Sequence, residues 1–367
     1  MPDHAAPAHP PAAAAGATAG NGTHAAGPAP GAQATAARRG RSLPEQAGLL
    51  VVLVALIAFF WVRSPYFATE NNIINVLTAI AVTGIIAVPG TMLVIAGQVD
   101  LSVGSGAALC GVIMASVAQS QPIWIGVLAA LAVGIVVGLI NGLLVTVVGV
   151  NSLITTLGML SALRGLTQVR ANGGTITLVN FSALGIGRPF LNIPVPVLLL
   201  LGIIVIAILV MRYTVFGRSV YATGSNPVAS RLVGIRGNRA IVIAFVASGL
   251  AFALSGLVLD SQLSAASPEA ATGLELTVIT AIVLGGASLS GGRGTIQGTL
   301  VGLLIIGVLN DGLTLLNVNS FYQEVASGVL LIIAVSFDQL RRRLAGWTLK
   351  RPARQQAVGP ARRWRAS

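Results

Sequence analysis

The sequence has little charge for its length. Only 9% of its 367 residues are charged, whereas a soluble domain carries about a quarter. Hydrophobic residues make up 54% of the chain. Because so few groups favour water, the composition excludes an ordinary soluble domain and indicates a protein that is solvated mainly by lipid.

Cysteine and histidine are almost absent from the apolar part of the chain. The single cysteine, Cys110, lies in an apolar run, so no internal disulfide can form. The three histidines, His4, His9 and His24, all lie near the N-terminus. Because the apolar region has no histidine and no nucleophile paired with a base, it predicts neither a metal site nor an enzyme.

Basic residues outnumber acidic ones and give a net charge of +12. They lie in tails and loops, whereas a nucleic-acid-binding face needs them clustered on a folded surface. When alternate loops are assigned to the two sides of a membrane, 18 of the 22 Lys and Arg residues fall on one side. The scattered basic residues therefore predict no nucleic-acid partner. The positive-inside asymmetry predicts an even number of spans, with both termini in the cytoplasm.

The two ends of the chain differ from its middle. Residues 1–45 are rich in Ala, Pro and Gly without apolar periodicity, which predicts a disordered tail. No signal-peptide core precedes the first apolar run, so this tail is expected to stay in the cytoplasm. Residues 343–367 are expected to form a second, basic cytoplasmic tail. Residues 46–342 between them are predicted to form the membrane domain.

The middle region contains ten apolar segments that are candidates for membrane spans. Several approach the ~20 residues that cross ~30 Å of hydrocarbon, and the shorter ones abut Gly or Pro and are expected to be broken or tilted. They cover residues 47–62, 73–96, 103–119, 123–148, 153–168, 195–211, 240–260, 275–290, 296–316 and 322–340. The sequence therefore predicts an all-α polytopic membrane protein of about ten helices, some of them broken or re-entrant.

A weak internal repeat agrees with the even number of spans. The stretch 139–143, followed by 150–152, resembles the stretch 309–313, followed by 318–320, at an offset of about 168 residues. In the predicted topology the two copies run in opposite directions, as in transporters with inverted halves of five spans each. Chance similarity in Leu-, Val- and Gly-rich sequence is the alternative.

Residues 97–105 place polar groups between two apolar spans. Asp100 lies there beside Gln98, Ser102 and several glycines. A carboxylate inside a membrane is costly, so the pattern indicates a broken helix whose freed backbone groups are satisfied within protein or along a watery cavity. Asp100 either caps the helix that follows or contacts a passing substrate. Even as a cap it would shape a turn along the pathway.

A second glycine-rich segment, residues 285–294, separates two further apolar runs. It has neither the lysine nor the preceding strand of a phosphate-binding loop. The segment instead predicts a tight turn near the cytoplasmic face, with Arg293 at the water boundary.

The longest cytoplasmic loop, residues 212–239, has the start and stop signals of a short helix. Ser225 or Asn226 can cap the helix, Pro227 suits its first position, and Gly234 can end it. A helix of two turns is too short to be stable alone. It therefore needs something to pack against, which is either a partner protein or, alternatively, its own chain or lipid headgroups.

At this loop the sequence resembles the ribose, xylose, arabinose and galactose permeases of bacterial ABC importers. The resemblance covers about residues 45–342 and rests on four motifs: 100–105, the run from 141 to 165, the loop 216–235 and the run 284–294. It implies a permease that moves a monosaccharide, with a pentose such as ribose expected, by alternating access. The implied partners are a second permease copy, ATPase subunits that bind ATP and Mg²⁺, a periplasmic sugar-binding protein and membrane lipid, with no cofactor in this chain.

The resemblance also assigns roles to particular residues. The residues expected to line or shape the substrate pathway are Asp100, Ser102, Asn141, Asn151, Thr155 and Glu275. The short helix at 227–233 is expected to be the coupling helix that seats in the ATPase. The residues expected to couple the chain to the ATPase are Gly217, Arg218, Ala222, Gly224, Asn226, Pro227, Ala229, Arg231 and Gly234.

Two positions depart from the family pattern. Gly97-Gln98 stands where the family commonly has two glycines, and Thr277 stands where it often has an acid. The second departure weakens the expectation of a polar pathway contact at that position. Glu275 remains, and the helix dipole, which favours an acid in the first turn, is the preferred explanation for it.

Three other functions remain open from the sequence. An ion-coupled secondary sugar transporter would use Asp100 or Glu275 for the coupling ion. A branched-chain amino-acid permease belongs to a related family with similar glycine motifs. A membrane enzyme is disfavoured because the apolar region lacks histidine.

Overall fold

The computed structural model describes residues 43–348, with residues 1–42 and 349–367 outside the described part. The predicted tails at 1–45 and 343–367 therefore lie almost wholly outside the described residues. Among the described residues, the first helix begins at Leu43 and the last helix ends at Thr348, and the predicted domain bounds at 46 and 342 stay a prediction.

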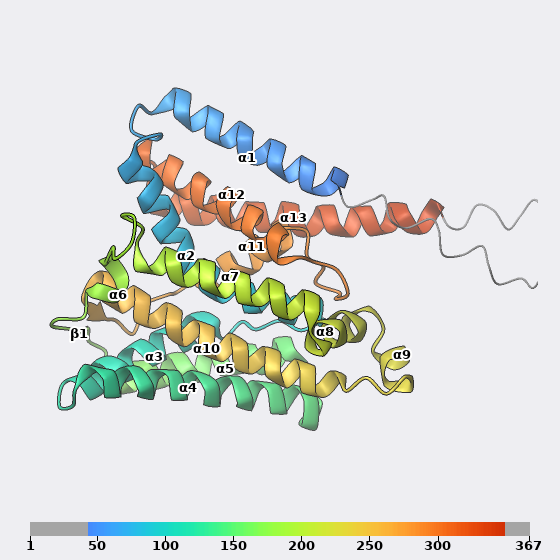
Figure 1. Ribbon diagram of the computed structural model, residues 1–367, viewed down its shortest axis with the longest axis horizontal. Coiled ribbons are helices and arrows are strands. Elements are labelled where there is room, and N and C mark those ends of the chain that lie inside the picture. The colour runs from blue at the N-terminus through green and yellow to red at the C-terminus, as the bar shows by residue number, and fades with distance from the viewer. Residues whose placement is uncertain (1–42, 349–367) are drawn as a thin grey trace, which may run out of the picture. The chain divides into compact units, whose positions relative to one another are not determined.

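Each of the ten predicted apolar segments coincides with a helix (Figure 1). The helices are α1 (Leu43–Arg63), α2 (Glu70–Ile95), α3 (Val103–Ala118), α4 (Ile123–Leu143), α5 (Ser152–Ala171), α7 (Val195–Tyr213), α10 (Gly237–Leu263), α11 (Leu274–Leu284), α12 (Ile296–Leu315) and α13 (Ser320–Thr348). The eighth segment was predicted too long, because α11 ends at Leu284 and the glycine-rich run that follows forms turns.

Shorter elements connect these helices. A π-helical turn, η1 (Leu144–Val148), extends α4, and the connections contain α6 (Ala183–Ile186), α8 (Val215–Ser225) and α9 (Pro227–Leu232). Two short strands, β1 (Ile176–Thr177) and β2 (Ala265–Ala266), pair antiparallel.

Five helices are long and apolar enough to cross a membrane: α2, α4 with η1, α7, α10 and α12. Shorter apolar stretches lie in α1, α3, α11 and α13. The predicted class, an all-α polytopic membrane protein, is confirmed. The number of ten crossings stays a prediction, because α5 is not among these apolar helices.

The two halves of the described chain repeat the same order of helices. A shift of about 168 residues brings the ranges of α2, α3 and α4 close to those of α10, α11 and α12, and brings the start of α5 onto the start of α13, which is the longer helix. In Figure 1, α2 and α10 run in opposite directions along the bundle, and so do α4 and α12. Both observations fit the predicted inverted halves.

The core lies where α2, α3, α4 and α10 pack together. Glycines allow the closest approach, which occurs between α4 and α10. A Cβ atom on Gly134 would overlap the carbonyl oxygen of Gly249, and a Cβ atom on Gly249 would overlap that of Gly134. Small residues at such crossings let helix backbones touch, which is how helices associate in lipid.

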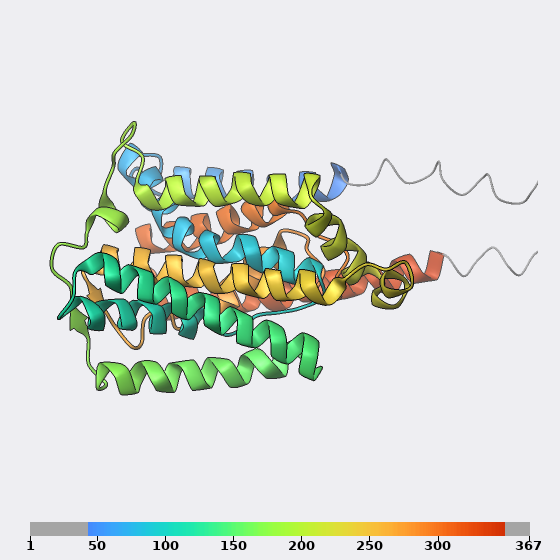
Figure 2. The same cartoon turned by 60° about the horizontal axis from the view of Figure 1, so that its bottom comes forward.

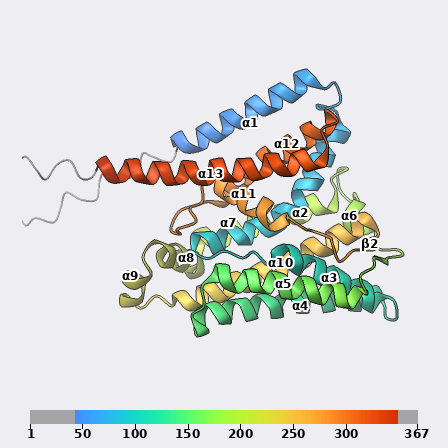
Figure 3. The same cartoon turned by 180° about the vertical axis from the view of Figure 1, so that it is seen from behind.

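The edges of the bundle carry α5 and α13. Figure 2 shows α5 at its lower edge, where it packs mainly on α3. Figure 3 shows α11 between α13 and α2.

We expect Gly249→Ala to destabilise the protein, because the added methyl group would overlap the backbone of α4. Overpacking of this kind costs about 1–3 kcal/mol, which a lower unfolding temperature in detergent would report. The matched control is Gly202→Ala on α7, where no atom lies within 4 Å of the added carbon. Equal unfolding temperatures for the two variants would contradict the close crossing.

Candidate functional site

The polar segment predicted at 97–105 is a break between two helices. α2 ends at Ile95 and α3 begins at Val103, with non-helical backbone between them. Gly97 has φ +79°, a conformation that favours glycine. Val99, Asp100 and Ser102 are buried, so the broken-helix prediction is confirmed.

The backbone groups freed at this break bind side chains of α5. The Val99 N–H donates to Ser152 Oγ at 3.3 Å. The Thr156 hydroxyl donates to the Ser152 carbonyl oxygen at 2.8 Å and makes a second, longer contact with the Val99 carbonyl oxygen at 3.5 Å. Neither partner was singled out in the sequence. Both lie within the 141–165 run, where Asn141, Asn151 and Thr155 were the expected pathway residues.

The Asp100 carboxylate joins three helices to the break. Its Oδ1 accepts hydrogen bonds from the Ser102 N–H at 3.0 Å and from the Ser102 hydroxyl at 2.6 Å. Its Oδ2 accepts from the Ser248 hydroxyl of α10 at 2.8 Å. Asn141 of α4 donates to Ser102 Oγ at 3.0 Å. We call Asp100, Ser102, Asn141 and Ser248 the Asp100 network.

The expected capping role of Asp100 holds in a modified form. Ser102 is the N-cap residue of α3, but its own side chain makes no capping bond. Asp100 lies two residues before Ser102, and its carboxylate accepts a hydrogen bond from the Ser102 N–H. The carboxylate therefore closes the turn that leads into the helix.

The structure brings together three of the six predicted pathway residues. Asp100, Ser102 and Asn141 are at most 6% exposed, in a closed network that borders none of the four cavities described for this chain. Asn151 is exposed and caps α5 by accepting the Leu153 N–H at 2.9 Å. Thr155 is buried on α5, and its hydroxyl has no hydrogen-bond partner within residues 43–348.

Glu275 lies apart from this network, in the first turn of α11 as expected. Its carboxylate packs against α3, because a Cβ atom on Gly104 would overlap Glu275 Oε2. That oxygen is buried and has no hydrogen-bond partner in the described chain.

A second break, between α10 and α11, is also held by α5. The Arg164 guanidinium donates to the carbonyl oxygens of Pro268, at 2.5 Å, and Ala270, at 3.0 Å. Gln168, one turn further along α5, donates to the Glu269 carboxylate. One helix therefore satisfies freed polar groups at both breaks.

The predicted coupling helix is present as α9, at the end of the bundle that carries the start of α1 (Figure 1). Asn226 caps it by accepting the Ala229 N–H at 3.0 Å, Pro227 is its first residue, and Gly234 follows with φ +78°. Val228 and Leu232 are 68% and 83% exposed. The helix therefore presents apolar side chains with no partner in this part of the chain.

The sequence did not predict α8, which precedes α9. Its cap, Thr214, follows α7 directly and accepts the Gly217 N–H at 3.3 Å. Of the predicted coupling residues, Gly217 is buried, and Ala222 and Gly224 are half-buried on this helix. Exposed positions are held by Arg218, Asn226, Pro227, Ala229, Arg231 and Gly234.

α8 contacts both the first break and the glycine-rich turn at 285–294. A Cβ atom on Gly224 would overlap the carbonyl oxygen of Ile95, the last residue of α2. The Gly292 N–H donates to that same oxygen at 2.8 Å, and the Tyr221 hydroxyl donates to the Gly294 carbonyl oxygen at 2.9 Å. Burial raises the pKa of Tyr221, which keeps its hydroxyl protonated as a donor.

A cavity of ≈ 750 Å³ lies behind α9. Gln98 from the break and Thr146 from η1 line it, together with Arg231, Arg236 and Arg239. The predicted turn at 285–294 is confirmed, and Arg293 within it is exposed as expected.

Sequence reasoning missed one further intramembrane acid, Asp260 of α10. Its side chain is 2% exposed and packs against α3, where a Cβ atom on Gly111 would overlap it. Its Oδ2 has no hydrogen-bond partner among the described residues. Its position at the end of the apolar segment 240–260 could have identified it, because Asp100 was identified as an acid that interrupts an apolar run.

Apolar helices in inverted order, broken where polar groups enter the bundle, define a polytopic membrane transport protein. Residues 72–335 match the model of the family described as branched-chain amino acid transport system / permease component. The chain belongs to this family of ABC-transporter permeases.

Curated relatives align over most of this chain. The ribose import permease protein RbsC of Escherichia coli K12 is 41% identical over 82% of this chain and 95% of its own length. RbsC of Haemophilus influenzae is 39% identical over 82% of this chain and 94% of its own length. The L-arabinose ABC transporter permease protein AraH of Azospirillum brasilense is 39% identical over 82% of this chain and 89% of its own length. No solved structure gives a significant match.

We expect Asp100→Asn to retain part of the transport activity and Asp100→Leu to abolish it. The asparagine oxygen can still accept the Ser102 N–H, and its amide can donate to Ser248, whereas leucine leaves these buried groups unpaired at about 1–3 kcal/mol each. Uptake of labelled ribose by cells expressing each variant at equal membrane levels measures the difference. Equal uptake by the two variants would contradict this role of the carboxylate.

Proposed function

We propose that this chain is the membrane-spanning permease subunit of an ATP-driven importer whose cargo is a pentose such as ribose. The names of its relatives support the cargo, because the ribose and L-arabinose permeases align over most of their length with this chain. The permease has no catalytic chemistry of its own. Its work is to open a path to one side of the membrane at a time.

The observation that carries the ATP-driven mechanism is the contact of α8 with the first break and with the glycine-rich turn at 285–294. α9 presents exposed apolar side chains to a partner, and α8 connects it to the end of α2 through Gly224 and to the glycine-rich turn through Tyr221. Movement of α9 on an ATPase would therefore be transmitted to the two turns that end α2 and α11. A rigid, short connection of this kind suits rocking of one half against the other.

The two ends of the bundle differ, and this difference indicates where each of the remaining partners would bind. The end with α8 and α9 carries Arg212, Arg218, Arg231, Arg236 and Arg239, and the positive-inside rule supports a cytoplasmic location for it. α1 begins and α13 ends at this same end (Figure 1), which agrees with the proposal that both termini are cytoplasmic. The opposite end, with α6 and β1, would receive the periplasmic binding protein. A second permease copy and two ATPase subunits, which bind ATP and Mg²⁺, complete the importer.

Two rival functions are less well supported. A branched-chain amino-acid cargo agrees with the description of the family model, but the aligned relatives named above carry sugars in their names. An ion-coupled transporter would need Asp100 or Glu275 at an ion path, and neither residue lines any of the four cavities described for this chain.

We expect Gly224→Val to uncouple transport from the ATPase, because the side chain would push α8 away from Ile95. Uptake of ribose by the reconstituted importer should fall at least about tenfold, while the ATPase subunit stays bound, because the exposed residues of α9 are unchanged. Arg231→Ala, on the exposed face of α9, should instead weaken binding of the ATPase subunit.

Gly202→Val is the matched control, since the added side chain meets no atom within 4 Å at its Cβ. Co-purification of the ATPase subunit and ribose uptake, measured on the same preparations, separate the two effects. Normal uptake by Gly224→Val would remove α8 from the coupling path.

A further inference from the structure

Two cavities adjoin at the half of the bundle away from α9. The first, of ≈ 280 Å³, lies between α2, α11 and α12. The second, of ≈ 590 Å³, lies between α2, α11 and the start of α13. Thr83, Thr277 and Asn310 line both, so the two cavities adjoin at these residues, and we call the pair the outer cavity.

The walls of the outer cavity combine apolar side chains with polar groups, most of them uncharged. Hydroxyl and carboxamide groups reach it from four helices: Thr83 of α2, Thr277 of α11, Asn310 of α12 and Gln323 of α13. Among the described residues that line it there are two acids, Asp311 and Glu324, and no Lys or Arg. A ligand carboxylate or phosphate would therefore find no cationic partner, whereas a neutral polyol would find donors and acceptors.

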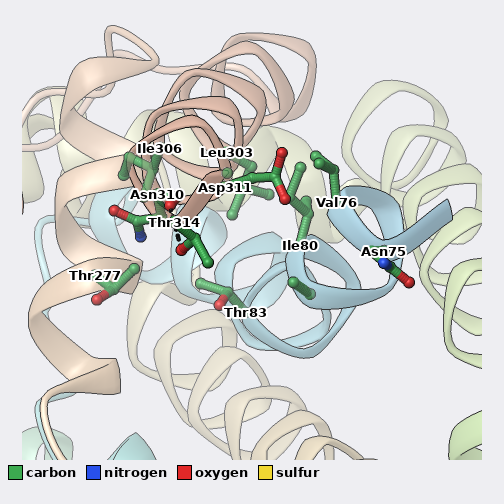
Figure 4. Close-up of a pocket in the computed structure, with 12 residues that line it drawn as sticks. Asn75, Val76, Ile80, Thr83, Thr277, Leu303, Ile306, Asn310, Asp311 and Thr314 are labelled. Carbon is green, nitrogen blue, oxygen red and sulfur yellow. Dashed lines mark hydrogen bonds between the residues drawn. The ribbon is translucent and has the colours of Figure 1, made fainter. Parts of the chain in front are cut away.

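One polar atom in this wall is left without a partner. Asn310 Oδ1 is buried and makes no hydrogen bond within residues 43–348. An unpaired buried acceptor is destabilising, and native structures contain few of them. Figure 4 shows the Asn310 side chain on α12 close to Thr277 of α11, at one side of the first cavity. A ligand hydroxyl in the cavity would supply the missing hydrogen bond.

Other groups in the wall are already held in place. Asn72 donates to Asp311 Oδ2 at 2.7 Å, and Gln323 Nε2 donates to Thr314 Oγ1 at 3.1 Å. These contacts fix the positions of side chains from different helices before any ligand arrives. A preorganised wall lowers the cost of ligand binding.

We propose that the outer cavity is the part of the transport path that contacts the sugar, with the Asn310 carboxamide and the Thr277 hydroxyl hydrogen-bonding to sugar hydroxyl groups. This inference rests on the proposed function. It moves the contact away from the Asp100 network, none of whose residues lines the outer cavity. It also returns a polar role to position 277, where threonine replaces the acid common in the resembling permeases.

The first test compares Asn310→Leu and Thr277→Val in the complete importer. Each should lower the initial rate of ribose uptake by about tenfold, because the site would lose a hydrogen bond to a hydroxyl group of the sugar. Asn310→Leu removes an unpaired buried acceptor, so a purely structural residue would show equal or higher stability and normal uptake. Unchanged unfolding temperature with lost uptake identifies the ligand contact.

Thr167→Val on α5 is the matched control for Thr277→Val. Both hydroxyl groups donate to a backbone carbonyl four residues earlier, Thr167 to Leu163 at 2.6 Å and Thr277 to Gly273 at 3.3 Å. Thr167 lines neither part of the outer cavity. Its variant should import ribose within about twofold of the wild type.

A second measurement uses the single cysteine of the chain. In a Cys110→Ala background, Thr277→Cys and Asn310→Cys should react with a small water-soluble thiol reagent, while Thr167→Cys should not, because only the first two border the outer cavity. Ribose delivered by its binding protein to the ATP-energised importer should slow the reaction at both positions.

The outcomes separate this inference from the function it rests on. If the wild-type importer takes up ribose and both cavity variants do so equally well, the cavity assignment is overturned and the function stands. Thiols at 277 and 310 that do not react would also overturn it. If the wild-type importer moves neither ribose nor arabinose, the proposed function and the sugar ligand both fail.

Discussion

An unpaired backbone N–H or C=O group costs several kcal/mol in hydrocarbon, and the break between α2 and α3 places such groups inside the bundle. Asp100 and its partners satisfy one side of this break, and Ser152 and Thr156 satisfy the other. Because these partners come from α4, α5 and α10, the hydrogen bonds of one short segment determine where three other helices lie. The same constraint acts at the second break, where Arg164 binds the carbonyl oxygens of Pro268 and Ala270.

The positions of the breaks explain how movement at one end can reach the other. α8 touches the end of α2 and the turn after α11, while α5 is bonded to both breaks. The core between them is tightly packed around glycine crossings such as Gly134 with Gly249. Packed interfaces tend to shift between discrete arrangements and do not deform continuously, so rotation of α8 is expected to move the breaks as units. The outer cavity lies in the half of the bundle away from α9, where such a shift would widen or close it.

Local features of this fold were predictable from sequence, and distant contacts were not. The helix α9 was predicted because its cap, its first-position proline and its terminal glycine lie within a few residues of one another. The break at Asp100 was predicted because an acid among glycines interrupts an apolar run. Its partner Ser248 lies 148 residues away and has no distinguishing neighbours. α8 was missed because it follows α7 after one residue, so no loop signal separates the two.

The cavity residues show the same limit. Thr277 and Asn310 lie on different helices, and neither stands out among the threonines and asparagines of the chain until the fold places them on one wall. The predicted pathway residues near the break follow glycine motifs, which mark breaks and not cavities. Three of them serve the break itself.

The central claim is that ATP hydrolysis in a partner, transmitted through α9, drives a pentose through this chain. The most direct test measures labelled ribose uptake into proteoliposomes that contain the permease, its ATPase and its binding protein, with ATP or with an imposed proton or sodium gradient as the only energy source. The account predicts uptake with ATP and none with either gradient. Uptake driven by an ion gradient in the absence of ATP would contradict it.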